Sequence, residues 1–289
     1  WRDILIYAPT PIARETLDEA VNNSSDKPSA DRVPEDTKKE LTAQVRQLSE
    51  DHSDSVAWLY IPDTNIDYPI MQSGDNEYYS HRAVDGSYLY AGSLFMDYRN
   101  SSDFTDFNSV IYGHNMGNAT CFADIPNYEN EEYFMNHSYG WLTTDDDVRL
   151  IDFFAVARTS DTSGLYLADP TFEEWDSQLR NCASIYKEIG ISPDDNLITL
   201  STCTSAEGNS RTILVGKIIE KCCEMKLKKT EKKILAADAS ALCFAAMMST
   251  SAYASGDVAG AVQSTWSTAR SQVVSVVFNV VFAVIIVIL

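Results

Sequence analysis

Basic residues are scarce in this sequence. It has 22 Lys and Arg against 42 Asp and Glu, which gives a formal net charge of −20. Residues 221–289 carry 7 basic and 4 acidic residues, a net of +3, so the first 220 residues carry −23. A chain this acidic repels nucleic acid, which we exclude as a partner. The acidic surface could attract basic substrates or Ca²⁺, or it could simply keep the protein solvated.

Cysteine patterns that indicate a metal site or a disulfide framework are also missing. No two cysteines form a C-x-x-C pair, and none shows a zinc-type spacing with histidine. We therefore predict no metal and no cofactor. The default interpretation of each cysteine is a small buried hydrophobe. The six are Cys121, Cys182, Cys203, Cys222, Cys223 and Cys243. Only Cys203 has neighbours that suggest another role.

The beginning of the chain has no basic segment followed by a long apolar run. We expect an N-terminal signal or anchor to be absent or trimmed. Residues Asn22–Asp36 are polar and include two prolines, so they are predicted to be a linker. A short helix is predicted over about Pro34–Glu50, where Leu41, Val45 and Leu48 recur at helical spacing.

Seven apolar runs of strand length lie between Ser55 and Ile219, and turn residues separate them. These runs are Val56–Ile61, Tyr68–Met71, Ser93–Met96, Ser109–Tyr112, Val148–Ala157, Asn196–Leu200 and Thr212–Ile219. Short strands at this spacing indicate a β-barrel or a β-sandwich.

One helix interrupts the strands. Thr171 and Glu174 form a capping-box pattern, with a hydroxyl at the helix start and a carboxylate three residues later. Apolar side chains then recur on one helical face as far as Tyr186. We therefore predict a crossover helix over Thr171–Ile189.

The C-terminal tail is a different kind of sequence. A basic stretch at Lys226–Lys233 precedes an apolar run, Ile234–Ala254, which ends in an A-Y-A sequence typical of signal-peptide cleavage sites. Gln272–Leu289 has no charge and is long enough to span a membrane. The tail could be a second secreted protein fused to the first, a C-terminal anchor, or a buried helix. It also has a weak likeness to small membrane pilins of conjugation systems.

Three short segments carry reactive side chains at the edges of predicted strands. They are I-Y-G-H-N at 111–115, T-L-S-T-C-T at 199–204 and S-R-T-I-L-V-G-K at 210–217. A thiolate at Cys203 could attack a carbonyl, an imidazole at His114 could exchange protons, and Arg211 could hold an oxyanion. Cys203 and Arg211 are close enough in sequence to lie on neighbouring hairpin strands.

These segments resemble the sortase family, whose pattern is T-L-x-T-C with Arg on the following strand and an upstream Y-G-H. Other segments are similar to class B sortases in particular. These are W-L-Y-I-P at 58–62, D-Y-P-I-M-Q at 67–72, N-E-Y-Y at 76–79 and G-S-L-F-M-D-Y-R-N at 92–100. The resemblance covers roughly Thr37–Ile219. The helix predicted at Thr171 also fits class B members.

The resemblance implies a mainly β fold, a closed eight-stranded barrel with N-terminal helices and one long crossover helix. Cys203 would be the nucleophile that forms a thioacyl enzyme, His114 the general acid and base, and Arg211 the residue that positions the signal and stabilises the oxyanion. Residues lining the groove would include Asn76, Leu165, Tyr166, Ser201 and Thr202.

The same resemblance implies a sorting signal of the N-P-x-T type, cut after Thr. The partners would be surface proteins or pilins that carry this signal, and an amine acceptor such as a lipid-linked peptidoglycan precursor. The enzyme would work at the membrane, on the extracytoplasmic face of a Gram-positive cell. Its domains would be an N-terminal segment and linker (1–36), the catalytic domain (37–220) and the tail (221–289).

The sequence also departs from the family pattern. Thr204 and Ser205 follow the cysteine where some class B enzymes have acidic residues, and the interval to Arg211 is short. Two other functions stay open. A cysteine protease or amidase would release the acyl group to water, although papain-like enzymes place their cysteine at a helix start. A barrel without activity would only bind sorting signals.

Overall fold

The computed structural model describes residues 10–22, 28–117, 119–167, 171–203 and 209–219. All of them belong to one compact unit, Trp1–Lys221. The predicted membrane tail, 221–289, lies outside the described residues. No helix in the described ranges is both long enough and apolar enough to cross a membrane.

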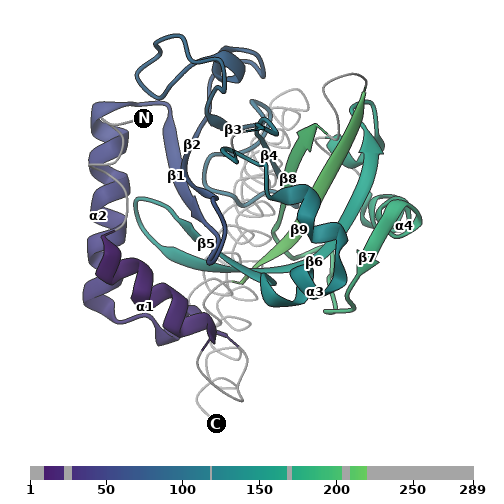
Figure 1. Ribbon diagram of the computed structural model, residues 1–289, viewed down its shortest axis with the longest axis horizontal. Coiled ribbons are helices and arrows are strands. Elements are labelled where there is room, and N and C mark those ends of the chain that lie inside the picture. The colour runs from purple at the N-terminus through teal and green to yellow at the C-terminus, as the bar shows by residue number, and fades with distance from the viewer. Residues whose placement is uncertain (1–9, 23–27, 118, 168–170, 204–208, 220–289) are drawn as a thin grey trace, which may run out of the picture. The chain divides into compact units, whose positions relative to one another are not determined.

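The nine strands of the described chain belong to one β-sheet that closes on itself (Figure 1). Its strands are β1 Ser55–Tyr60, β2 Asp67–Met71, β3 Leu94–Met96, β4 Asn108–Tyr112, β5 Tyr139–Thr143, β6 Val148–Ser160, β7 Ala183–Tyr186, β8 Leu197–Cys203 and β9 Ser210–Ile219. The order is β5-β1-β2-β3-β4-β8-β9-β6, and pairing of β5 with β6 completes the ring. Eight strands therefore form a closed barrel, as predicted, and β7 is added outside on β6.

Helices and short 3₁₀ turns cover parts of the barrel. They are α1 Pro11–Asn22, η2 Ala30–Arg32, α2 Glu35–Asp51, η3 Tyr78–His81, η4 Ile125–Glu129, α3 Glu131–Asn136, η5 Gly164–Tyr166 and α4 Phe172–Cys182. Helices α1 and α2 lie together beside β1, and α4 lies on the far side of the molecule near β7 (Figure 1).

Alternating side chains bury both faces of several strands. On β1, Leu59 points into the barrel core, while Trp58 and Tyr60 join a second cluster beneath α1 and α2. On β9, Leu214 points inward and Val215 packs in a third cluster that includes residues of α4. Burial on both faces explains why these strands appear in the sequence as continuous apolar runs.

The predicted crossover helix is shorter than expected. The sequence indicated a helix through Ile189, but α4 ends at Cys182 and the chain continues as β7. The edge of β6 beyond β5 offers unpaired backbone groups, and Ile185 pairs there with Val156. These sheet hydrogen bonds override the helical periodicity. The capping box also differs, because Thr171 Oγ1 donates to Glu174 Oε2 (2.8 Å) and makes no side-chain bond to the backbone.

The N-terminal region holds more structure than the sequence indicated. The helix predicted near Pro34 is confirmed as α2, but α1 was not predicted. Leu17 of α1 is buried in the second cluster, with Trp58 and Tyr60 of β1. The Tyr60 hydroxyl donates a hydrogen bond to Asp18 (2.8 Å). Arg14 forms an ion pair with Asp67 on β2. Within the predicted linker, η2 forms a short turn.

Candidate active site

The segment carrying His114 lies beside the strand that ends at Cys203. Strands β4 and β8 pair in parallel, with Tyr112 opposite Ser201. The backbone N–H of Gly113 continues this pairing by donating to the carbonyl of Ser201 (3.1 Å). If the register is carried on by two residues, His114 is level with Cys203. The parallel pairing thus brings the carboxyl ends of both strands to one edge of the barrel.

Arg211 is the cross-strand partner of Cys203. Strands β8 and β9 are antiparallel, and these two residues face each other in the register. The predicted hairpin relation is therefore confirmed. The Arg211 guanidinium lies 3.4 Å from Asp161 Oδ2. The side chain of Cys203 and the following residues 204–208 lie outside the described residues.

The His114 ring is fixed by the 3₁₀ turn η3. Its Nε2 lies 2.8 Å from the backbone carbonyl oxygen of Ser80. A carbonyl oxygen only accepts, so Nε2 carries the proton and donates it. The ring of His81 stacks on that of His114, with centroids 5.3 Å apart and planes inclined by 22°. Neither Ser80 nor His81 was singled out from the sequence, where His81 lies two residues beyond the class B segment ending at Tyr79.

Four of the five predicted groove residues lie on β8 and η5, and the fifth, Asn76, lies elsewhere. Tyr166 and Ser201 touch, their hydroxyl oxygens 2.8 Å apart, and both are buried. Leu165 is also buried, and its carbonyl accepts from Asn108 Nδ2 (3.2 Å). Thr202 is buried with no hydrogen-bond partner for its hydroxyl in the part of the chain that is described. These four residues line up along β8 and η5.

Asn76, the fifth predicted groove residue, is connected to the others through Asp97. Its Nδ2 donates to Asp97 Oδ2 (3.0 Å), and the Tyr112 hydroxyl donates to the same oxygen (2.9 Å). Arg99 donates from Nε to Asp97 (2.8 Å) and from Nη2 to the carbonyl of Tyr166 (3.0 Å). A continuous polar network therefore joins Asn76 to Tyr166.

Asp97 is the centre of this network and carries a charge inside the protein. Only 2% of the residue is exposed. Burial alone would raise the pKa of Asp97, but hydrogen bonds from Arg99, Tyr112 and Asn76 outweigh burial and lower it. Burial raises the pKa of the Tyr112 phenol, and the neighbouring Asp97 carboxylate raises that pKa further. Asp97 therefore remains ionised and holds its three partners in place.

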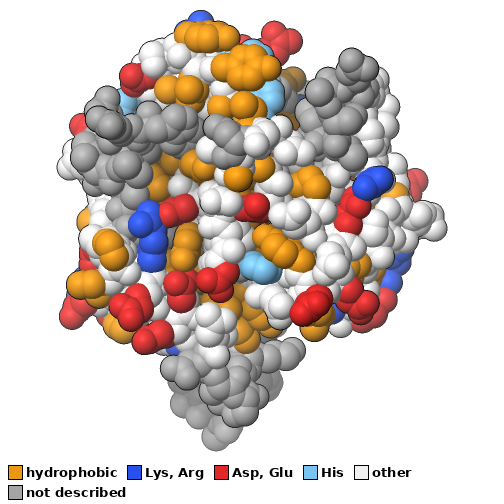
Figure 2. Space-filling view, viewed as in Figure 1, with side chains coloured by type: hydrophobic (Ala, Val, Ile, Leu, Met, Phe, Trp, Pro, Cys, Tyr) orange, Lys and Arg blue, Asp and Glu red, His pale blue; other side chains and the backbone are white. Residues whose placement is uncertain are grey.

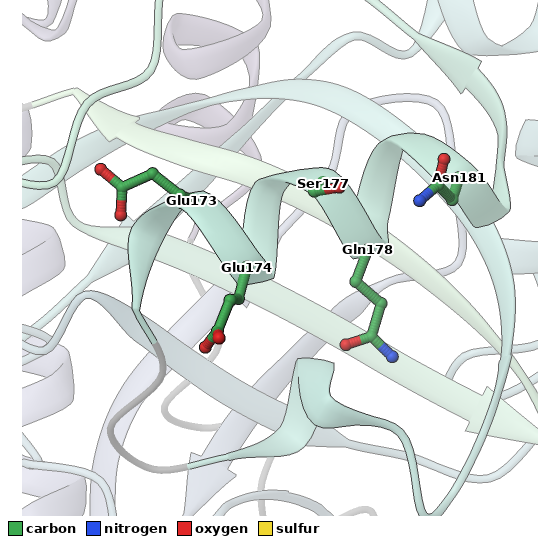
Figure 3. A pocket seen from close by; sticks show the side chains of 5 residues that line it. All are labelled: Glu173, Glu174, Ser177, Gln178 and Asn181. Atoms are coloured by element: carbon green, nitrogen blue, oxygen red, sulfur yellow. The ribbon is translucent and has the colours of Figure 1, made fainter.

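A separate hollow runs along the outer face of α4 (Figure 3). Glu173, Glu174, Ser177, Gln178 and Asn181 line it. None of the predicted site residues contributes to it. Over the face shown in Figure 2, acidic side chains are spread widely and basic ones are few, in keeping with the charge of the sequence.

Comparison with known families identifies the fold. A model described as the sortase domain matches residues 59–219, more than half of the chain. The chain belongs to the sortase family. A second model, described as a protein of unknown function (DUF3852), matches residues 229–289 of this sortase.

Individual relatives place the sortase near class B. It is 35% identical over 193 residues to sortase B of Listeria monocytogenes, a match that covers 63% of this chain and 76% of the relative. It is 30% identical to a Streptococcus pyogenes class B sortase involved in pilus biogenesis, with a TM-score of 0.56, covering 60% of this chain and 97% of that structure. Clostridium perfringens sortase B matches at 28% identity and TM-score 0.56, covering 61% and 99%. The sortase is thus a cysteine transpeptidase of the class B type.

Proposed function

We propose that this sortase cuts an N-P-x-T-type sorting signal after Thr and joins the freed carboxyl end to an amine. The Cys203 thiolate attacks the Thr carbonyl, the peptide C–N bond breaks, and a thioester forms. His114 gives a proton to the departing amine. An acceptor amine then attacks the thioester and passes a proton to His114, which forms the new amide and frees Cys203.

One observation carries this proposal, which is the convergence of three strand ends. Cys203 faces Arg211 across β8 and β9, and the parallel register of β4 with β8, which pairs Tyr112 with Ser201, would bring His114 level with Cys203 if it continues by two residues. We assign Arg211 to hold the signal and the oxyanion, because its planar fork of donors carries a permanent charge. With Nε2–H donated to Ser80, the nitrogen of His114 left to exchange protons is Nδ1.

The assignment of the signal rests on the class B relatives and on the groove. We assign Asn76, Leu165, Tyr166, Ser201 and Thr202 to the surface that contacts the pentapeptide. The network centred on Asp97 supports this assignment, since it fixes Asn76 and the Tyr166 backbone with respect to each other.

The acceptor and the location follow from the same reasoning. The substrates are surface proteins or pilins that bear the signal, and the acceptor is an amine of a lipid-linked peptidoglycan precursor or of a pilin. The relative from S. pyogenes, involved in pilus biogenesis, supports the pilin as one source of the amine. We place the enzyme on the extracytoplasmic face of a Gram-positive membrane, with domains at 1–36, 37–220 and 221–289.

A fluorogenic pentapeptide assay with added amines tests the proposal. Cys203→Ala should abolish cleavage and transfer, and His114→Ala should lower kcat/KM by about 10²- to 10⁴-fold. Arg211→Lys should lose about 10²-fold, because a point charge does not copy the guanidinium fork. An active Cys203→Ala protein would contradict the mechanism.

The same assay tests the signal and the acceptor. An N-P-x-T peptide should be cut faster than an L-P-x-T-G peptide, and equal specificity constants would refute the class B signal. Product that forms only by hydrolysis, whatever amine is added, would favour a cysteine hydrolase instead.

A further inference from the structure

Two consecutive residues of η3 hold the His114 ring from different directions. The Ser80 carbonyl accepts the Nε2 proton in the ring plane, at 2.8 Å. The His81 ring covers the face, at a centroid distance of 5.3 Å. A hydrogen bond fixes which nitrogen is protonated, and a stacked ring restricts rotation about the side-chain torsions. Together they define both the tautomer and the plane of the imidazole.

The turn that provides these contacts is packed tightly from behind. Gly92 has a φ of +60°, and a Cβ atom built on it would lie 2.3 Å from the Ser80 carbonyl oxygen. The next residue, Ser93, donates its backbone N–H to the Tyr79 carbonyl (3.0 Å). The Ser80 carbonyl therefore has little room to move away from His114.

His81 is itself held in position by the same loop. Its Nδ1 lies 3.0 Å from the Tyr90 carbonyl, which can only accept, so Nδ1–H is the donor. The Tyr90 ring also stacks with the His81 imidazole, with centroids 6.1 Å apart and planes inclined by 26°. His81 therefore has ring contacts with both Tyr90 and His114, the proposed proton-transfer group. Figure 2 shows hydrophobic and histidine side chains gathered at the upper edge of the view.

His81 contributes little to the folded core. It is exposed to solvent, as is Tyr90, 70% of which is accessible. Substitutions at exposed positions usually change stability little. The His81 ring is exposed, hydrogen-bonded at one nitrogen and stacked with two other rings, so its contacts point to a role other than stability.

We propose that His81 is a positioning residue for the transpeptidation reaction. Its ring keeps the imidazole of His114 in one orientation and in the Nε2–H tautomer. In this arrangement Nδ1 is directed to the reaction. This inference rests on the proposed role of His114. It adds a residue, His81, whose stacking is needed for full turnover although it does not touch the reacting atoms.

Three variants separate the stacking from the loop contact. His81→Ala removes both. His81→Phe keeps an aromatic face but loses the bond to the Tyr90 carbonyl, and His81→Asn keeps a donor for that carbonyl but loses the ring. His137→Ala is the matched control, since that histidine also stacks on an aromatic ring (Tyr133, 3.9 Å) and bonds its carbonyl, but has no contact with η3 among the described residues.

Full-length protein in detergent should show a loss of turnover in the variants without the ring. We expect His81→Ala and His81→Asn to lower kcat by about 10-fold or more, with KM for the peptide changed less than about twofold, because misaligned groups slow chemistry rather than binding. His81→Phe should recover most of kcat. His137→Ala should match the parent enzyme.

A spectroscopic measurement reports the position of His114 directly. In the Cys203→Ala background above pH 8, where an ordinary imidazole is neutral, a long-range ¹H–¹⁵N spectrum should show His114 as the Nε2–H tautomer. That tautomer should persist with His81→Phe and become mixed with His81→Asn. Unchanged kcat in His81→Ala, recovery by Asn instead of Phe, or an unchanged tautomer in a slow variant would each overturn the inference. His114→Ala is measured in parallel, since an active His114→Ala enzyme refutes the proposed function rather than this inference alone.

Discussion

At the scale of single residues, Asp97 holds together the polar network that joins Asn76 to Tyr166. It is a buried carboxylate that receives hydrogen bonds from Arg99, Tyr112 and Asn76. Hydrogen bonds to a charged group stabilise a protein by about 1.5–3 kcal/mol, and an amide in place of the carboxylate leaves Arg99 without its counter-ion. Asp97→Asn should therefore lower the free energy of unfolding by about 2 kcal/mol near neutral pH.

The stabilisation that Asp97 provides should depend on pH in a defined direction. The folded pKa of Asp97 is lowered from its ordinary value of 3.8, so the carboxylate stabilises the fold at every pH above that value. The stabilisation is lost as pH falls below 3.8 towards the lowered pKa. The difference between parent and Asp97→Asn, measured by denaturant unfolding, should be constant from pH 5 to 8 and shrink in acid. A difference that grew in acid would contradict the ionised network.

Residue patterns predicted part of this site and could not predict the rest. The seven residues between Cys203 and Arg211 limit the connection to a short hairpin, so their pairing followed from the sequence. The position of His114 depends on the parallel pairing of β4 with β8, strands about 90 residues apart, which no local pattern specifies. The contacts of His81 depend on a loop of irregular backbone, and its stacking on His114 has no signature in sequence.

At the scale of elements, short or mixed segments escaped prediction. All seven predicted apolar runs form strands. Strand β5 was not predicted, because Gly140 interrupts its apolar residues. An added Cβ at Gly140 would lie 3.1 Å from the Phe153 ring, a tight contact that the ring would relieve by shifting a few tenths of an ångström. Strand β7 shares the helical periodicity of α4 and is determined only by the free edge of β6.

Helix α1 was the largest element that the sequence did not indicate, and it offers a test of the N-terminal boundary. Its Leu17 is 1% exposed and packs in the cluster with Trp58 and Tyr60. Leu17→Ala should lower the free energy of unfolding by about 2–5 kcal/mol, and the melting temperature by at least roughly 5 °C. Thermal unfolding measures this. Ile12→Ala is the control, since Ile12 lies on the same helix but is 75% exposed.

Equal melting temperatures for the two α1 variants would show that the helix is not docked in solution. A large loss for Leu17→Ala alone would place α1 in the catalytic unit. A fragment that starts at residue 37 would then lack part of its own core, and fragments for assays should begin before Pro11.

At the scale of the whole molecule, the last prediction concerns the tail, which we expect to be separate from the enzyme. The charge changes sign across the junction, from −23 on residues 1–220 to +3 on residues 221–289. The sortase model ends at residue 219 and the second family model begins at residue 229. Strand β9 ends at Ile219 with β8 and β6 on its two sides, so it has no open edge for the tail to complete.

Removing residues 221–289 should therefore raise solubility and leave turnover per folded molecule unchanged. The apolar runs of the tail have lengths suited to a membrane, whereas those of the barrel have the lengths of strands. The comparison pairs the full chain in detergent with the fragment 1–220 in buffer, each normalised by its thiol titre minus that of its own Cys203→Ala variant, because other cysteines also react. A fragment that unfolds, or that loses most of its activity per titrated thiol, would show that the tail forms part of the enzyme.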